Sequence, residues 1–137
     1  MEKKYPLYGL DVSEETSPLE AGLRWAVDLD KNGFVGQEAL NQQEETGIGR
    51  LLVGIEFADD AFLPAIGDEV HVDGQPVGAV TSSDSGHLLG RTLAMGYLPP
   101  ELVGSTVIVT SAESGADKDG TVTDRPFYDP DGTRLRA

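Results

Sequence analysis

The chain has 137 residues, enough for one domain or one domain with an appendage, and its 24 acidic and 10 basic residues give a formal net charge of −14. This charge repels phosphate groups, so it argues against nucleic acids and anionic membranes as partners. The chain contains no cysteine and only two histidines, which excludes disulfides and thiolate chemistry and makes a zinc site unexpected.

The N-terminal segment is expected to need a partner surface. Residues 5–10 are mostly apolar, but the segment is too short and too interrupted by Pro6 to form a stable element alone. Residues 11–16 are polar and predict a loop. No apolar run reaches the ~20 residues that span a bilayer, and the start of the chain lacks the apolar core of a signal peptide. We therefore expect a cytoplasmic protein whose first residues pack against something supplied upstream or by another chain.

Ser17 begins the first predicted helix. Its hydroxyl can cap the helix, Pro18 suits the first helical position, and Glu20 lies three residues after the cap. Gly22 ends this helix within about two turns. Residues 24–30 then alternate Trp25 and two aliphatic residues with small or polar ones, which predicts a half-buried strand.

A second helix and a set of strands follow. Residues 36–45 have helical composition, and Gly47 and Gly49 end the helix and mark the best internal boundary. Asp73 and Gly74 predict a tight hairpin between two strands. The expected strands are Leu51 to Phe57, Glu69 to Val72, Pro76 to Thr81, Thr92 to Leu98, Thr106 to Thr110 and Gly120 to Thr123.

These elements predict a mainly β fold with a short α/β N-terminal segment. About six short strands punctuated by glycine and proline are typical of a small antiparallel barrel or sandwich, and we expect a β-barrel. The predicted organisation is an N-terminal segment over 1–47, a C-terminal β-barrel domain over 48–128 and a polar tail over 129–137.

The acidic turn after residue 27 imitates a calcium loop. Asp28, Asp30, Asn32 and Gly33 match the first, third, fifth and sixth positions of an EF-hand loop. The twelfth position, which should be a bidentate glutamate, is Ala39. We therefore interpret the segment as an acidic turn between a strand and a helix, and predict no metal site.

The order of several motifs resembles the glycine-cleavage T-protein (aminomethyltransferase) family. Residues 7–40 contain LYG, PLEAGL, a tryptophan and FVGQEAL in the family's order, and the likeness continues over nearly the whole chain. It includes LLVGIEF at 51–57, GDEVHVDGQPVGAVTS at 67–82, LGRTLAMGYLPPEL at 89–102 and RPFYDPDGTRLRA at 125–137. The ending is equally similar to the folate-binding halves of dimethylglycine and sarcosine dehydrogenases and related demethylases. Where the family has Ser-Pro after a turn, this chain has Thr81-Ser82-Ser83, so we expect a differently shaped loop there.

The resemblance implies tetrahydrofolate-dependent transfer of a one-carbon unit from an amine, with the barrel covering the folate pocket. It places the family's catalytic aspartate in a large N-terminal portion, so we expect no catalytic residue in this chain. It also implies that Met1 is an internal methionine or the edge of a trimmed chain. The expected partner is the missing N-terminal domain or a partner subunit, with a homo-oligomer as a further possibility.

Four residues are candidates for contacting folate by this resemblance. Tyr8 and Trp25 can stack on the pterin or benzoyl ring, and Arg125 can pair with the glutamate carboxylate near Tyr128. Structural alternatives stand beside these roles: Trp25 as a core residue, Arg125 as a surface residue and Tyr128 as a plug of the barrel. An alternative function, in another class, is a non-enzymatic acidic β-barrel interaction module or subunit lid.

Overall fold

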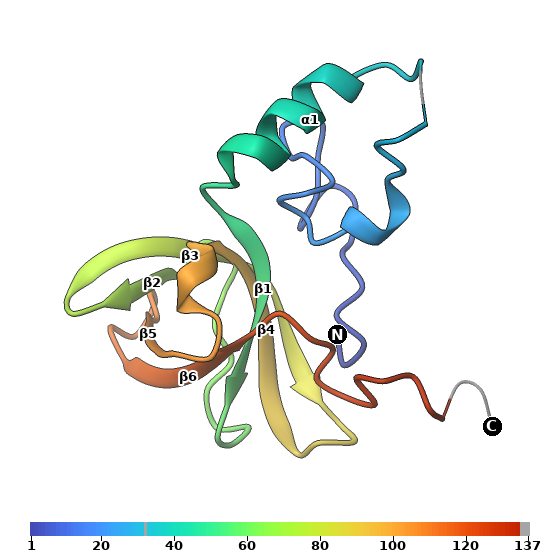
Figure 1. Ribbon diagram of the computed structural model, residues 1–137. Coiled ribbons are helices and arrows are strands. Elements are labelled where there is room, and N and C mark those ends of the chain that lie inside the picture. Colours follow the sequence, from blue (N-terminus) through green and yellow to red (C-terminus); the bar gives the residue numbers. More distant parts are fainter. Residues whose placement is uncertain (32, 135–137) are drawn as a thin grey trace.

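Six antiparallel strands close into a barrel in the computed structural model, which describes residues 1–31 and 33–134 (Figure 1). The mainly β fold and the small barrel predicted from the sequence are confirmed. The elements in chain order are η1 (Arg24–Ala26), α1 (Gln37–Thr46), β1 (Leu51–Phe57), β2 (Glu69–Val72), β3 (Gln75–Gly86), β4 (Arg91–Leu98), η2 (Pro100–Leu102), β5 (Thr106–Thr110) and β6 (Asp117–Thr123).

The barrel closes in the order β1-β4-β3-β2-β5-β6 around an aliphatic core. Alternate residues of each strand point inward, so Val53, Ile55 and Phe57 of β1 enter the core together. Closure pairs every strand on both sides and leaves no open sheet edge. The other buried residues of this core are Val70, Val80, Ala94, Leu98, Val107, Val109 and Val122.

Most strand bounds agree with the sequence prediction, and β3 is the main exception. The predicted hairpin joins β2 to β3, with Asp73 at φ 50° and Gly74 at φ 75°. Strand β3 runs on to Gly86 because its pairing with β4 continues past a bulge, where the register shifts between Val80 and Ser82. The loop expected around residue 82 is therefore part of a strand.

Residues 1–48, called the N-terminal region below, lie against the outside of the barrel. The predicted helical turn at Ser17 is confirmed, with the Glu20 N–H donating to Ser17 Oγ (3.1 Å) and the Ser17 N–H to Glu20 Oε2 (2.9 Å). The Glu20 carbonyl in turn accepts the Leu52 N–H of β1 at 2.7 Å. Helix α1 lies above the barrel in Figure 1, and none of its residues is buried.

The strand predicted over residues 24–30 is wrong. The segment begins with the 3₁₀ turn η1 and continues as irregular chain, and Trp25 is 83% exposed, so the core interpretation of this residue is also wrong. An alternating pattern makes a strand only where a neighbouring strand accepts its backbone bonds, and the described chain offers none here. The backbone instead turns back, with the Ala26 N–H donating to the Leu23 carbonyl at 2.9 Å.

The acidic turn that imitates a calcium loop is held by its own backbone. Asp28 Oδ1 accepts the Asp30 N–H at 3.1 Å, as in an Asx turn, whereas Asn32 lies outside the described residues. Across residues 1–31 and 33–134 no group of three or more His, Cys, Asp or Glu side chains is placed to hold a metal ion. Over the same stretches, no helix combines the length and apolarity needed to cross a bilayer.

Candidate functional site

Tyr8 stands on a tightly closed loop. The Asp11 N–H donates to the Leu7 carbonyl at 2.9 Å, and the Gly9 N–H donates to the Val12 carbonyl at 2.8 Å. The Tyr8 side chain is 68% exposed, so one face of its ring is open to a ligand or a partner. The same loop buries Asp11, the first residue of the polar loop predicted over residues 11–16.

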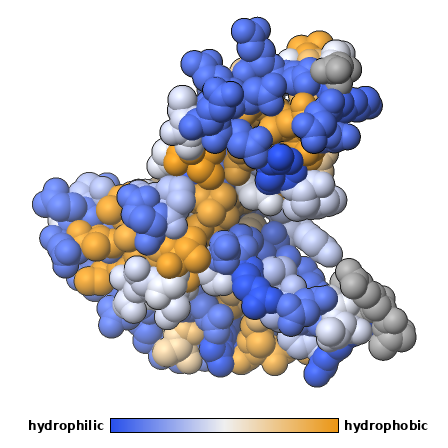
Figure 2. All heavy atoms as spheres, in the orientation of Figure 1, coloured by the Kyte–Doolittle hydropathy of each residue, from blue (hydrophilic) through white to orange (hydrophobic). Residues whose placement is uncertain are grey.

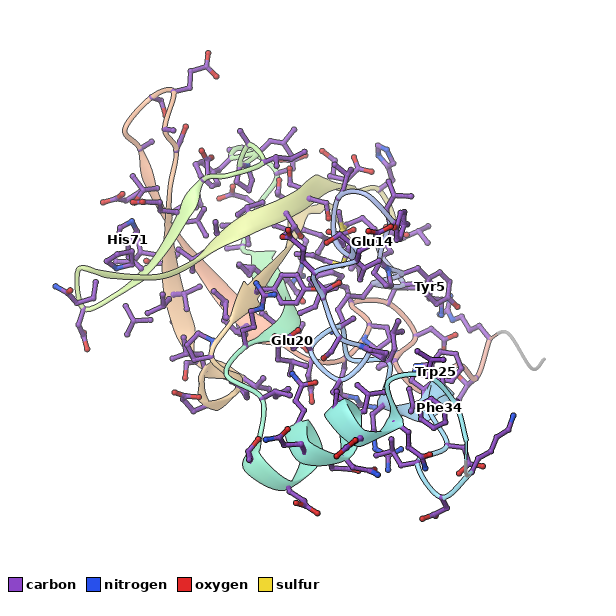
Figure 3. All side chains as sticks on the ribbon, turned by 90° about the horizontal axis from the view of Figure 1, so that it is seen from above. Tyr5, Glu14, Glu20, Trp25, Phe34 and His71 are labelled. Carbon is purple, nitrogen blue, oxygen red and sulfur yellow. The ribbon has the colours of Figure 1, made fainter. Side chains whose placement is uncertain are left out.

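Trp25 also presents its indole ring to solvent. Figure 3 shows Tyr5, Trp25 and Phe34 on one side of the molecule, away from His71 at the far end of the barrel. Next to Trp25, an open hollow of about 400 Å³ is lined mainly by apolar side chains of the N-terminal region, including Ala26, Val27, Phe34 and Val35. This side of the N-terminal region therefore combines an exposed indole with an open, mainly apolar recess.

Tyr128 lies outside the barrel, between two cations. The Lys3 Nζ atom is 5.4 Å and the Arg134 guanidinium carbon 5.2 Å from the centre of the Tyr128 ring. The Arg134 guanidinium also donates to the Tyr128 hydroxyl, and the Tyr128 N–H donates to the Glu2 carbonyl at 3.0 Å. The interpretation of Tyr128 as a barrel plug is therefore wrong, and Phe62 is the aromatic loop residue that packs against the core.

An ion pair fixes the tail to the start of the chain. Lys3 Nζ lies 2.9 Å from Asp129 Oδ2, and the Asp129 side chain is only 5% exposed. The hydrogen bond from Lys3 lowers the pKa of Asp129 to about 2, with further help from the Thr133 hydroxyl and the Arg134 N–H. Asp129 thus neutralises Lys3, and Arg134 forms no ion pair with any residue in the described ranges.

Arg125 is a surface residue, as the structural alternative predicted. Its guanidinium pairs with the Asp131 carboxylate, and 59% of its side chain is exposed. A folate carboxylate would have to compete with Asp131 for this cation. Arg134 is the residue that the sequence prediction missed, because its proximity to Tyr128 depends on a turn of the tail around Asp129 that no motif indicates.

The structure does not assemble the four predicted residues into one cluster. Within residues 1–31 and 33–134, no hydrogen bond, ion pair or ring stacking joins any two of Tyr8, Trp25, Arg125 and Tyr128. Tyr8 and Tyr128 are connected indirectly, because the N-terminal segment that carries Tyr8 is bound at Glu2 and Lys3 by the tail. The candidate site therefore consists of two exposed aromatic side chains, Tyr8 and Trp25, and the partly buried Tyr128 with its two cations.

The barrel matches a known family model. Residues 50–129 match the model described as the glycine cleavage T-protein C-terminal barrel domain. These residues include all six strands, the loops that join them, and both Arg125 and Tyr128.

Relatives extend the similarity into the N-terminal region. An aminomethyltransferase of Halalkalibacterium halodurans is 41% identical over 110 residues, which cover 79% of this chain and 30% of that protein. One of Nostoc sp. is 37% identical over 129 residues, which cover 93% of this chain and 34% of that protein. The crystal structure of glycine cleavage system aminomethyltransferase T from Bartonella henselae superposes with a TM-score of 0.84 at 27% identity, over 94% of this chain and 37% of that one. The chain thus spans about a third of the length of the proteins that it matches.

Proposed function

Because this chain belongs to the glycine cleavage T-protein family, we propose that it serves in a tetrahydrofolate-dependent transfer of a one-carbon unit from an amine. The observation that carries the proposal is the match to aminomethyltransferases, which extends over 93% of the chain and includes the N-terminal region. We propose that the chain acts as the C-terminal portion of such an enzyme and is inactive by itself. The cytoplasmic location expected from the sequence belongs to the same proposal.

The chain's role in this reaction is to bind and orient rather than to move protons. The exposed side chains of Tyr8 and Trp25 suit the aromatic rings of folate, and the Arg134 guanidinium beside Tyr128 suits its carboxylates, whereas Lys3 is already paired with Asp129. When bound, tetrahydrofolate supplies the nitrogen that accepts the one-carbon unit. We assign no catalytic residue here, because the resemblance places the family's catalytic aspartate upstream of the matched third. Holding the ring in one orientation, and keeping water from it, is how aromatic residues contribute to such a transfer.

The N-terminal region has the surface of an incomplete domain. Helix α1 buries none of its residues, and Val35 and Trp25 are fully or largely exposed. Figure 2 shows apolar surface where α1 joins β1, beneath the hydrophilic outer side of the helix, and the hollow there is lined by Leu19, Ile48 and Leu51. We propose that residues 1–47 complete a preceding T-protein-like domain, while 48–128 form the barrel domain and 129–137 the tail. That domain comes from the same polypeptide or from a partner subunit. We also propose, as an alternative, that copies of this chain assemble into a homo-oligomer.

A chimera tests the proposed function. This chain would replace the matched C-terminal region of the Halalkalibacterium halodurans aminomethyltransferase, and tetrahydrofolate binding would be measured by calorimetry for the chimera and for the 137-residue chain. We expect the chimera to bind tetrahydrofolate and to transfer the aminomethyl group, and the isolated chain to bind at least a hundredfold more weakly.

The matched control carries the corresponding region of the Nostoc protein in the same place. If the control chimera binds tetrahydrofolate and a cooperatively folded chimera with this chain does not, the proposed function is wrong. Stable association of this chain with the upstream portion, without folate binding, would instead favour the acidic β-barrel interaction module or subunit lid. The observation that favours this second function is the exposed apolar segment from Tyr5 to Leu10.

A further inference from the structure

Residues 7–12, called the Tyr8 loop, are closed by a carboxylate as well as by backbone bonds. Asp11 Oδ2 accepts the Leu7 N–H at 2.9 Å, across the mouth of the loop. Asp11 is 2% exposed, whereas the apolar side chains of Leu7 and Tyr8 are 58% and 68% exposed. The loop therefore has a buried polar base and an exposed apolar tip.

The second oxygen of the same carboxylate binds the barrel. Asp11 Oδ1 accepts the hydroxyls of Thr81 at 2.6 Å and Ser82 at 2.7 Å, and the Asp11 carbonyl accepts the Tyr97 hydroxyl at 2.8 Å. One residue of the N-terminal region thus holds side chains from both β3 and β4.

The bulge in β3 makes this arrangement possible. Neighbouring side chains of a regular strand point to opposite faces, so two consecutive hydroxyls would not meet one carboxylate oxygen. The register shifts between Val80 and Ser82, where two residues oppose one on β4, and Thr81 and Ser82 both face Asp11. The bulge in β3 is therefore the place where the Tyr8 loop binds the barrel.

A buried carboxylate is a costly way to gain stability alone. Desolvation of the charge offsets much of what its hydrogen bonds contribute, and an apolar contact of the same size would stabilise equally well. Three hydrogen bonds to the two oxygens of one carboxylate fix both the position and the orientation of the loop on the barrel. The group that this orientation fixes is the exposed ring of Tyr8.

We propose that Asp11 is a positioning residue for tetrahydrofolate, acting through Tyr8. It clamps the Tyr8 loop to the Thr81–Ser82 bulge, so that the aromatic ring of Tyr8 is presented in one orientation to the aromatic part of the ligand. This inference rests on the proposed function, because it takes Tyr8 as a folate contact.

Ser82→Ala and Ser83→Ala form a matched pair that tests the clamp. Ser82 Oγ donates to Asp11, whereas Ser83 Oγ donates to the Pro64 carbonyl and does not touch the loop. Asp11→Asn tests the carboxylate itself, since it keeps the shape of the side chain and removes its charge. Amide hydrogen exchange in the 137-residue chain reports loop release, and the folate chimera described above reports Kd and turnover.

We expect Asp11→Asn and Ser82→Ala to speed exchange at residues 7–12 about tenfold, the value of one charge-assisted hydrogen bond, without changing exchange in β1 or β5. In the chimera, both should weaken tetrahydrofolate binding by a similar factor and leave turnover at saturating folate unchanged. Ser83→Ala should alter neither quantity.

Three results would overturn the proposal. Unchanged exchange in the loop of Asp11→Asn would show that the carboxylate does not hold it. A released loop with wild-type folate affinity would show that its orientation is irrelevant to binding. A chimera with wild-type sequence that binds no tetrahydrofolate, while its Nostoc control does, would remove the proposed function and the positioning role together, and is thereby distinguished from the other two.

Discussion

The barrel and the N-terminal region of this chain obtain their structures in different ways. In the part of the chain that the structure describes, the twelve largest fully buried side chains all lie between Leu52 and Val122. Among its described residues, 1–31 and 33–48, the N-terminal region buries only Leu19, Ala21 and Asp11, and each belongs to a segment that contacts the barrel. The barrel is therefore stabilised by its own core, whereas the N-terminal region takes its shape from the surface that it covers.

The outer face of the barrel also carries buried apolar side chains. Leu93 and Met95 alternate with the inward-facing Ala94, so they point away from the core, yet both are buried. Leu52 of β1 is also buried outside the core, and its backbone bonds the Glu20 carbonyl and the Lys4 side chain. At Leu52 the outer face of the barrel is thus bound to the N-terminal region, and the apolar side chain there is removed from water.

The largest expected effect comes from the core itself. Ile55→Ala should lower the free energy of unfolding by about 2–5 kcal/mol, because Ile55 is completely buried and its removal leaves a cavity. Leu40→Ala in α1, where no residue is buried, should cost less than about 1 kcal/mol. Urea titration of both variants measures the difference. Equal losses would mean that the N-terminal region has a core of its own.

A smaller effect is expected at the helical turn that docks on β1. Ser17→Ala removes one half of the capping box with Glu20, and should destabilise this turn by about 1 kcal/mol. Hydrogen exchange at the amides of Ala21 and Leu23, both bonded within the turn, reports the loss. Ser17→Thr keeps the capping oxygen and should restore protection; if it does not, the cap is not the cause.

The link between the tail and Lys3 should respond to acid. The hydrogen bond from Lys3 lowers the pKa of Asp129 from its ordinary 3.8 to about 2. A carboxyl whose pKa is lowered on folding stabilises the folded form above pH 3.8, and loses this contribution as the pH falls towards 2. An NMR titration of the Asp129 carboxyl should therefore have its midpoint near pH 2.

Lys3→Met is the informative variant for this link, since it keeps the aliphatic stem and removes the charge. The Asp129 midpoint should then rise towards its ordinary value. A midpoint that stays low would assign the shift to the Thr133 hydroxyl and the Arg134 N–H, the other donors to this carboxylate.

The smallest effect on stability is expected at Trp25. Trp25→Ala should change the free energy of unfolding by less than about 0.5 kcal/mol, because the side chain is 83% exposed. As the chain has a single tryptophan, its fluorescence reports this position alone. In the chimera, the part of the emission that Trp25→Phe removes is the part that tetrahydrofolate should quench if Trp25 stacks on the ligand. Unaltered emission at saturating folate would remove Trp25 from the proposed site.

The same contrast explains which features the sequence could predict. Strands β1, β2 and β5 have the bounds expected from alternation, because their inward residues meet one another in a closed barrel. Residues 24–30 show a similar alternation without a neighbouring strand, and the prediction failed there. A periodic pattern states which side of a segment is apolar, and it does not state whether a partner strand is present.

The sequence predicted the parts of the candidate site that depend on local motifs, and missed the parts that depend on long-range contacts. Motif order indicated Tyr8 and Trp25, and both prove to be exposed. The surroundings of Tyr128 and Asp11 depend on residues far apart in sequence, since Lys3 is 126 residues from Asp129 and Asp11 is 70 from Thr81. No local pattern encodes such a contact, because only the closed barrel brings the two segments together.

The bulge in β3 holds one residue that has no partner of its own on β4. Ala79 and Val80 pair with β4 before the shift, and Ser82 and Ser83 resume the same inward and outward alternation after it. Deleting the codon for Thr81 would therefore leave every other side chain of the strand on its present face. The barrel would keep its register and lose one of the two hydroxyls that donate to Asp11. A single-residue deletion could therefore weaken the attachment of the Tyr8 loop while the barrel fold is retained.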